Sequence, residues 1–308
     1  MFKNMKLGAK IGVGFACLIV IAVALGGLAI WNMRSVKTTA TELSVEKVPQ
    51  VQLATAVERT SLLTMYAARG YNYTEEKQFL DDATKELANV KKALTACKDH
   101  ASKYNIAILK ENEAKASAKV AEYEGLLNDT VAKTEAMAKD KAASLVAGDK
   151  YMKVCNAYVT RKSKDQEKAI SVANDEKSKA QLTQLTKEIT IVNEIIDLGN
   201  WIRTGTWQAI ATRDPKLFQE TEKKFDDVNK KLDEIKAGTT DAQDLKEVEE
   251  CRVAGKEYLD CMTSFLTNWL AREEIGKKRV EVAAAVLTAA KETSTAGGDE
   301  VAKSASAV

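Results

Sequence analysis

The sequence predicts an all-α protein anchored in a membrane: an N-terminal transmembrane helix followed by two stacked four-helix bundles, built from six helices of which two are long and shared. Three observations support this fold class. Residues 11–30 carry no charge and are almost wholly apolar. The 308 residues include only two prolines, and Lys, Glu, Asp and Ala dominate, which is typical of long amphipathic helices. If the expected helices run alternately away from the membrane and toward it, their lengths bring the end of the chain back close to the membrane.

The apolar run predicts a transmembrane helix with a fixed orientation. At about 1.5 Å of rise per residue, it covers the roughly 30 Å hydrocarbon core of a bilayer. Three lysines precede the run and Trp31 follows it. The lysines place residues 1–10 in the cytoplasm, 11–33 in the membrane and 34–305 outside the cytoplasm. A cleaved secretory signal is the alternative, since residues 22–24 resemble a cleavage site, but the apolar run is longer than a usual signal.

Turn signals divide the exported region into the six expected helices. Asp214 before Pro215 is a helix cap followed by a proline at the first helical position. Gly238 is a helix terminator, and Thr240 with Gln243 predicts a capping box for the last helix. From these and weaker signals, we expect helix ends near Tyr71, Cys97, Ser171, Arg213, Gly238 and Thr293.

An internal repeat favours two bundles of one design. At a constant offset of 138, apolar residues in 79–94 match apolar residues in 217–232, and at an offset of 135 Tyr123 matches Tyr258. Chance registration of amphipathic helices is the alternative, although the turns also match in position. We estimate the distance of each residue from the membrane by adding the rise per residue along each expected helix. This estimate divides the exported region into a membrane-proximal bundle of residues 34–130 and 265–305 and a membrane-distal bundle of residues 131–264.

The opening heptapeptide MFKNMKL, the Gly-rich span through Trp31 and the six-helix layout resemble the N-terminal part of a methyl-accepting chemotaxis protein, a bacterial chemoreceptor, with a helical bimodular sensor domain. The resemblance covers nearly the whole chain. It implies a protein of the bacterial inner membrane whose periplasmic sensor domain binds small molecules, typically organic acids, between bundle helices. It also implies signalling by a helix displacement of about 1–2 Å.

The same resemblance implies partners. The working unit would be a homodimer, embedded in the membrane. A cytoplasmic adaptor and a kinase would be reached only through a C-terminal signalling part that follows a second span. Neither segment occurs up to Val308, so we expect either that the sequence stops just before that second span or that the protein is not a receptor.

Candidate ligand residues in the membrane-proximal bundle are mostly arginines. A small carboxylate needs a cationic pocket, and an arginine side chain can hold it with two hydrogen bonds. The resemblance places ligand arginines on the first helix, where Arg59 matches best, but the family's second arginine three residues further on is Leu62 here. The candidates in this bundle are Arg59, Tyr66, Arg69 and, by distance along the last helix, Arg279, with Tyr123 between them.

In the membrane-distal bundle the segment 201–207, WIRTGTW, stands out. Arg203 and Trp207 are four residues apart and share a helix face, whereas Trp201 and Trp207 do not. A cavity lined by arginine and aromatic rings suits a carboxylate on a small apolar body. The candidates here are Trp201, Arg203, Trp207 and, on the last helix, Arg252. The alternative is that such arginines are solvated and such aromatic residues are core.

Other chemistry is not indicated. The 46 basic and 44 acidic residues nearly cancel, so a basic field for nucleic acid is absent. His100 is the only histidine, and no Gly-rich phosphate loop follows a strand. We therefore expect no enzyme, no catalytic residues, no cofactor and no metal. Cys155 and Cys251 are expected at similar distances from the membrane along their helices, either as buried free thiols or as a disulfide.

Two other functions share these features. A membrane-tethered structural or adaptor protein would have the same span and helices, with broad apolar stripes and no cavity. The sensor domain of a sensor histidine kinase would differ only in the segment after the second span. The gene beyond residue 308 separates all three.

Overall fold

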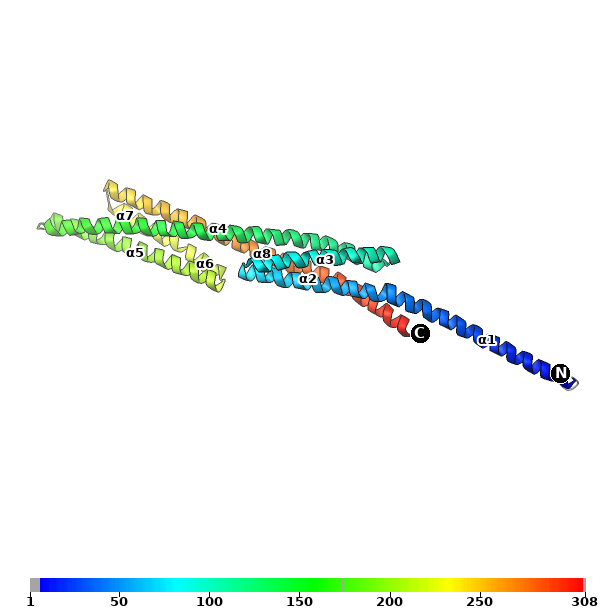
Figure 1. The fold of residues 1–308 in the computed structure, drawn as a ribbon. Helices are drawn as coiled ribbons and strands as arrows, with labels where there is room; N and C mark the ends of the chain where they lie inside the picture. Colours follow the sequence, from blue (N-terminus) through cyan, green and yellow to red (C-terminus); the bar gives the residue numbers. More distant parts are fainter. Residues whose placement is uncertain (1–5, 173, 307–308) are drawn as a thin grey trace. The chain divides into compact units, whose positions relative to one another are not determined.

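The computed structural model describes residues 6–172 and 174–306, and within them it shows helices and short connections but no strand. The helices are α1 (Leu7–Glu42), η1 (Leu43–Lys47, a π-helical turn), α2 (Val48–Thr74), α3 (Lys77–Tyr104), α4 (Ala107–Val172), α5 (Glu176–Thr212), α6 (Pro215–Glu222), α7 (Lys224–Gly238) and α8 (Ala242–Ser306). The predicted all-α class is confirmed (Figure 1). In this described part, α1, η1 and α2 run on without a break and only Lys223 separates α6 from α7, so the six expected helices are present.

The first helix carries the apolar run. None of the residues of α1 is buried, and its most apolar window has a mean hydropathy of 2.7, which by length and composition is enough to cross a membrane. The π-helical turn after it has a local cause. Pro49 has no N–H to donate to the carbonyl of Val45, four residues earlier, so the regular ladder is interrupted and the turn widens.

Several helix ends differ from the predicted ones. Helix α3 continues to Tyr104 instead of ending near Cys97, and Asn105, in the left-handed conformation at φ 54°, ends it. Helix α8 continues past Thr293 to Ser306. The capping box predicted at Thr240 is wrong, because Asp241 caps α8. The Asp241 Oδ1 accepts the backbone N–H groups of residues 243 and 244, each at 2.9 Å.

The cap predicted at Asp214 is confirmed. Its Oδ1 accepts the backbone N–H of Lys216 at 2.9 Å and that of Leu217 at 3.2 Å, both in the first turn of α6. A capping box that was not predicted lies at the start of α5, where Asp175 and Ser178 satisfy each other's backbone N–H groups.

The chain forms two compact units. Unit 1 comprises Met1–Gly125 and Arg279–Val308, and unit 2 comprises Leu126–Lys278. The long helices α4 and α8 contribute to both. The predicted division lay at residues 130 and 264. Phe265 and Trp269, on the segment predicted for the membrane-proximal bundle, pack on Phe218 in unit 2, with ring centroids 5.4 and 6.1 Å from that of Phe218.

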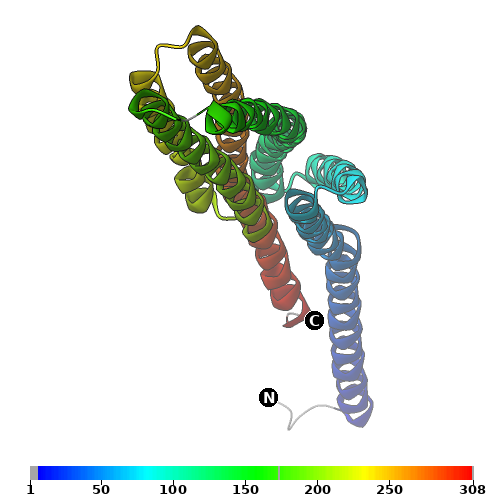
Figure 2. The same ribbon diagram turned by 90° about the vertical axis from the view of Figure 1, so that its left-hand side faces the viewer.

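Unit 1 is a bundle of α2, α3, the first part of α4 and the last part of α8. Figures 1 and 2 show α2 and α3 side by side. A polar layer joins three of the helices in the core. Buried Gln50 donates to the carbonyl oxygen of Thr293 at 3.4 Å, and buried Asn112 donates to the Thr293 hydroxyl at 3.1 Å. Lys47 pairs with Glu300 at 2.6 Å, so the end of α8 returns beside the start of α2.

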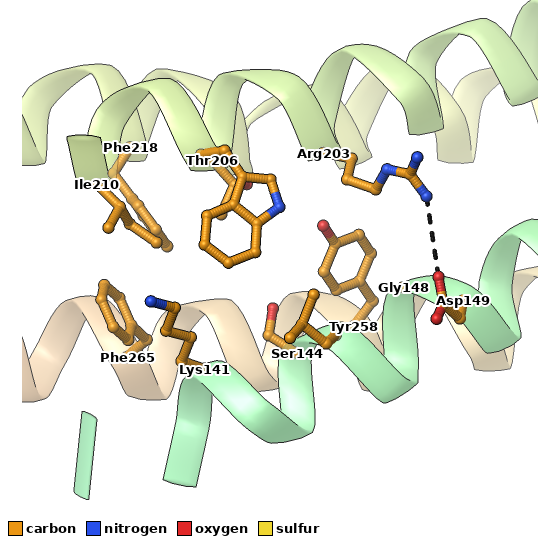
Figure 3. Close-up of a pocket in the computed structure, with 12 residues that line it drawn as sticks. Lys141, Ser144, Gly148, Asp149, Arg203, Thr206, Ile210, Phe218, Tyr258 and Phe265 are labelled. Carbon is orange, nitrogen blue, oxygen red and sulfur yellow. Dashed lines mark ion pairs between the residues drawn. The ribbon is translucent and has the colours of Figure 1, made fainter. Parts of the chain in front are cut away.

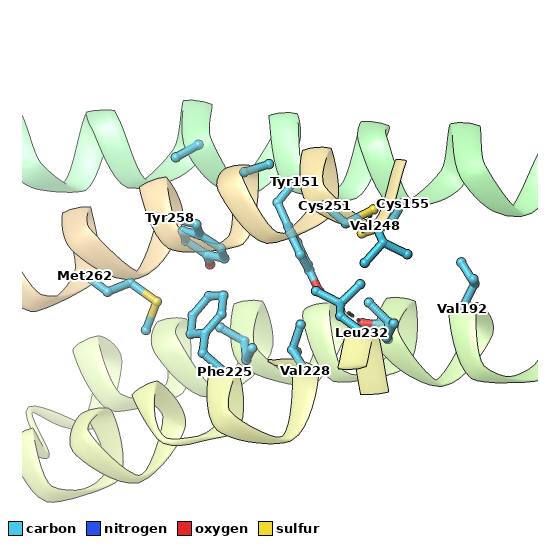
Figure 4. Packing of buried hydrophobic residues seen from close by; sticks show 14 of the residues in the cluster. Tyr151, Cys155, Val192, Phe225, Val228, Leu232, Val248, Cys251, Tyr258 and Met262 are labelled. Carbon is cyan, nitrogen blue, oxygen red and sulfur yellow. Dashed lines mark hydrogen bonds between the residues drawn. The ribbon is translucent and has the colours of Figure 1, made fainter. Parts of the chain in front are cut away.

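Unit 2 is a bundle of α5, α6 with α7, and the remaining parts of α4 and α8. Its core is aromatic: the ring of Phe225 on α7 stands edge-on to Tyr151 on α4 and to Tyr258 on α8, at centroid distances of 6.2 and 5.6 Å (Figure 4). The predicted repeat matches this burial. Three of the pairs at offset 138 are buried in both units, namely Leu87 with Phe225, Val90 with Val228 and Leu94 with Leu232.

Candidate functional site

A cavity of about 280 Å³ opens in unit 2 between α4, α5, α6 and α8. Apolar side chains form much of its wall, and two cations, the Asp149 carboxylate and three hydroxyl groups also line it (Figure 3). That combination is typical of small-molecule sites, in which a few polar groups orient a ligand in an apolar cleft. The cations are Lys141 and Arg203, the hydroxyl groups belong to Ser144, Thr206 and Tyr258, and the aromatic wall is made by Trp207, Phe218 and Phe265.

The two cations at this cavity are weakly engaged. Arg203 on α5 pairs with Asp149 on α4 at 3.8 Å, and the side chains are 52% and 77% exposed, so this pair contributes little to stability (Figure 3). The Lys141 Nζ lies 5.0 Å from the centroid of the Trp207 ring, a cation–π contact. Both charges are therefore available to an anion that enters the cavity.

Tyr258 and Gly148 shape the inner wall. A Cβ atom on Gly148 would lie 3.1 Å from the Cζ of Tyr258, so the absence of a side chain on α4 leaves room for the phenol ring. Burial raises the pKa of Tyr258, although a hydrogen bond with Thr206 and the charge of Arg203 oppose the increase. The phenol consequently stays protonated at neutral pH and can donate a hydrogen bond.

The predicted residues of unit 2 separate into two groups. Arg203 and Trp207 line the cavity together. Trp201 does not line it: the ring is 44% exposed and lies under the Lys224 Nζ at 5.5 Å. Arg252 is also elsewhere, because it pairs with Asp233 at 2.5 Å and donates to the Asn229 side chain at 3.0 Å.

In unit 1, some of the predicted residues lie near one another: the charges of Arg69 and Arg279 both act on Tyr123. Arg59, Tyr66 and Arg69 are not buried on α2. Arg279 is buried, and its charge acts on buried Tyr123: burial raises the pKa of that phenol, while Arg279 and Arg69 oppose the increase.

A small cavity beside this cluster has a volume of about 20 Å³. Its walls include the Ser61 and Thr64 side chains of α2 and the Tyr123 ring of α4. That volume holds about one water molecule and not an organic acid. Unit 2 therefore offers the better ligand site.

A buried charge cluster in unit 2 was not predicted. Lys162 on α4 forms ion pairs with Glu188 on α5 and with Asp244 on α8, and all three side chains are 3–4% exposed. Beside it, Arg161 pairs with Asp244 and donates twice to Glu247, each time at 2.9 Å. Lys162, Glu188, Asp244 and Arg161 line a second, more polar cavity of about 680 Å³, together with residues from the end of α4, the first turns of α5 and the connection between α7 and α8.

The sequence contained a signal for this cluster. Lys162 continues the spacing of the buried residues Tyr151, Cys155 and Tyr158 along α4. In the same way Glu188 falls between buried Leu185 and Val192 on α5. A charged residue in phase with a buried stripe indicates a buried, paired charge, because an unpaired one would be too costly.

Acid is expected to weaken this cluster. Burial alone would raise the pKa of Asp244, but hydrogen bonds, above all the one from Lys162, outweigh it and hold the pKa below the ordinary value of 3.8. A carboxyl group whose pKa is lower in the folded chain contributes stability above its unfolded value, and this contribution is lost as the pH falls through the folded value.

Urea unfolding titrations should therefore show a loss of unfolding free energy that begins near pH 3.8 and grows as the pH falls further. In the Asp244→Asn variant that part of the acid dependence should disappear. An acid dependence that is the same in both chains would contradict the role given to Asp244.

Comparisons with known proteins find similarity to solved structures, among them that of a sensor domain. No protein-family model matches the chain, and no curated protein matches it in sequence. The structure is similar to the TorS sensor domain, in the crystal structure of its complex with TorT in the presence of TMAO. The match has a TM-score of 0.50 and 10% sequence identity, and it covers 81% of this chain and 99% of the other. The chain therefore shares the helical fold of the TorS sensor domain.

Proposed function

We propose that this chain is the exported, ligand-sensing part of a transmembrane signalling receptor of the chemoreceptor type in a bacterial inner membrane. Three findings support it: a helix long and apolar enough to span a membrane, the fold of a helical sensor domain, and a cavity of about 280 Å³ between helices of unit 2. The cavity carries the proposal, since a tethering protein needs none. The chain is proposed to bind and not to catalyse.

The proposed ligand is a small organic acid with an apolar body. Its carboxylate would displace Asp149 from Arg203 and lie within reach of Lys141, because the existing ion pair is long and exposed. Its apolar part would lie against the rings of Phe218 and Phe265. A guanidinium–carboxylate pair with two hydrogen bonds would be stronger than the contact it replaces.

Direct binding is proposed for this chain because the cavity is its own. The TorS sensor domain was crystallised in complex with a second protein, TorT, in the presence of TMAO. A chain that responds to acids only when another protein is added would instead support indirect sensing.

The proposed signal is a small displacement of helices. A ligand that contacts Lys141 on α4, Arg203 on α5 and Tyr258 on α8 would draw these helices together within unit 2. Known helix shifts of this kind are about 1–2 Å. A homodimer is part of the proposal, and the exposed side chains of Leu62, Leu63 and Tyr66 on α2, which continues from the span, are available to a second copy.

The test is a thermal-shift screen of the full chain in detergent against organic acids, amino acids and amines. A binding ligand raises the midpoint of unfolding by an amount that grows with its concentration relative to its Kd. Arg203→Gln and Lys141→Gln should each weaken the binding of an active acid by roughly 10- to 100-fold, because a charge-assisted hydrogen bond is worth about 1.5–3 kcal/mol.

Arg252→Gln is the matched control. It removes the same charge from the same unit, but Arg252 does not line the cavity, so the affinity should not change. A flat response to every compound, or an equal loss in all three variants, would reject the proposal and favour a tethering function.

A further inference from the structure

Two cysteines meet in the core of unit 2. Cys155 on α4 and Cys251 on α8 have their sulfur atoms 3.7 Å apart, in direct contact (Figure 4). Their exposed fractions are 0% and 1%. Ninety-six residues separate them in the sequence, so the fold alone brings them together.

Their surroundings are apolar. The side chain of Val248 lies beside the pair, and Tyr151, one turn before Cys155, donates its hydroxyl to the carbonyl of Ile195 at 3.4 Å (Figure 4). The hydrogen bond with Cys155, followed by burial, raises the pKa of the Cys251 thiol. In the folded chain this thiol is therefore protonated and slow to react.

We infer that Cys155 and Cys251 form a disulfide once the region behind the span has crossed the membrane. The inference depends on export and not on the proposed ligand. Thiols outside the cytoplasm meet an oxidising environment, where disulfides form and persist. The two sulfur atoms, 3.7 Å apart, need to approach by less than about 2 Å to reach the S–S length of a disulfide, about 2.05 Å.

The oxidant is the disulfide of an exported thiol–disulfide oxidoreductase. One cysteine, as the thiolate, attacks this disulfide, so that a mixed disulfide forms and the first oxidoreductase thiolate leaves. The second cysteine then attacks the mixed disulfide, and the sulfur–sulfur bond between Cys155 and Cys251 forms as the second thiolate leaves. Two protein thiols are oxidised, one disulfide is reduced, and the two protons end on the oxidoreductase thiols. Because both sulfur atoms are buried, the exchange takes place before the core closes.

The bond would fix how α4 and α8 lie against each other in unit 2. Closing a long loop of chain reduces the freedom of the unfolded state, so the oxidised chain should be the more stable one. The cavity lies between this pair of helices and α5 with α6. A ligand would then move α5 and α6 against a pair held together covalently.

The test is to map the thiols of the full chain. Membranes are solubilised without reductant, the chain is unfolded in guanidinium with a maleimide reagent, and the peptides are identified by mass spectrometry. We expect the peptides with Cys155 and Cys251 joined, two hydrogen atoms lighter than their sum, and unlabelled. All of these cysteines are free thiols in the structure, but Cys97 lies in unit 1 and Cys261 lies ten residues after Cys251 on α8, so both should be labelled in the same sample.

A second experiment applies if the chain is isolated with its cysteines reduced. It is unfolded and refolded with oxidised and reduced glutathione, which does not depend on export. A link between Cys155 and Cys251 in preference to any other pair supports the inference. Labelling of both cysteines in both arms, or a link of either one to Cys97 or Cys261, overturns it.

Serine variants distinguish the effect of the disulfide on stability from other effects of the reductant. Reductant should lower the thermal midpoint of the oxidised chain and leave the Cys155→Ser/Cys251→Ser chain unchanged. Cys261→Ser, at a cysteine of the same unit, should keep both the link and the response to reductant. A response to reductant that survives in the double variant would contradict the assignment.

Discussion

Replacing Lys162 with methionine should destabilise the folded chain by about 3–5 kcal/mol, because it removes a cation that is paired with two buried carboxylates, Glu188 and Asp244, and leaves Asp244 with its pair to Arg161 alone. Glu188 and Asp244 would both lose their ion pair to Lys162 while remaining 3% exposed. Methionine keeps most of the length of the side chain, so little of the effect comes from packing. Urea unfolding at neutral pH, followed by circular dichroism, measures the loss.

Lys91→Met is the matched control for this prediction. Lys91 pairs with Glu124 at 2.6 Å on the surface of unit 1, where the side chains are 47% and 43% exposed. Such a pair is worth at most about 1 kcal/mol. Similar losses in the two variants would show that the burial of the cluster has no energetic consequence.

Replacing the two carboxylates by amides distinguishes the effect of unpaired charge on stability from the effect of side-chain packing. If unpaired charge causes the loss, the triple variant Lys162→Met/Glu188→Gln/Asp244→Asn should recover part of the stability of Lys162→Met, because amides are less costly to bury than carboxylates. A triple variant less stable than the single one would show that these side chains act through packing or hydrogen bonds instead.

The helices could be predicted because their signals are local. Scarcity of proline, apolar spacing and the Asp214-Pro215 cap indicated six helices, and the structure contains them. The last turns of α3 were missed because the signal there is conformational: Asn105 ends the helix in the left-handed region, and a helix end without glycine is harder to recognise.

The face of α2 could not be predicted from hydrophobicity. This helix buries small and polar residues such as Ala54, Ser61 and Thr64, while Leu62 and Tyr66 are exposed. Close packing against neighbouring helices favours small side chains, and the sequence alone does not reveal which face packs. For the same reason Arg59 and Arg69, in phase with the large apolar residues, lie outside the core.

In unit 2 the cavity was partly foreseeable. Spacing on one helix placed Arg203 and Trp207 on a common face, and both line the cavity. The sequence did not predict that Lys141 and Ser144 of α4 also line the cavity, because this depends on how helices that are far apart in the sequence are aligned with each other. Arg252 was expected at the cavity because it lies on the last helix, but its place on that helix does not specify the direction of its side chain, which reaches Asn229 and Asp233 instead.

Phe218→Ala should cost about 3–5 kcal/mol of unfolding free energy, since it removes a buried ring that its neighbours cannot replace. Phe218 is 1% exposed, stacks on Phe265 at a centroid distance of 5.4 Å and stands edge-on to Trp269 at 6.1 Å. Urea unfolding measures the loss, and the fluorescence of Trp269 should report the changed contact. Leu80, at the matching position of the repeat, is half-buried, so Leu80→Ala should reduce the unfolding free energy by less.

The same variant tests the site, because the ring of Phe218 is also a wall of the cavity. Without it, the cavity gains volume between Ile210 and Phe265, on the side where the apolar body of the ligand is proposed to lie. At temperatures where the variant is folded, acids with bulkier apolar parts should gain affinity relative to smaller ones. An unchanged order of affinities would show that the ligand does not occupy this cavity, whatever the loss of stability.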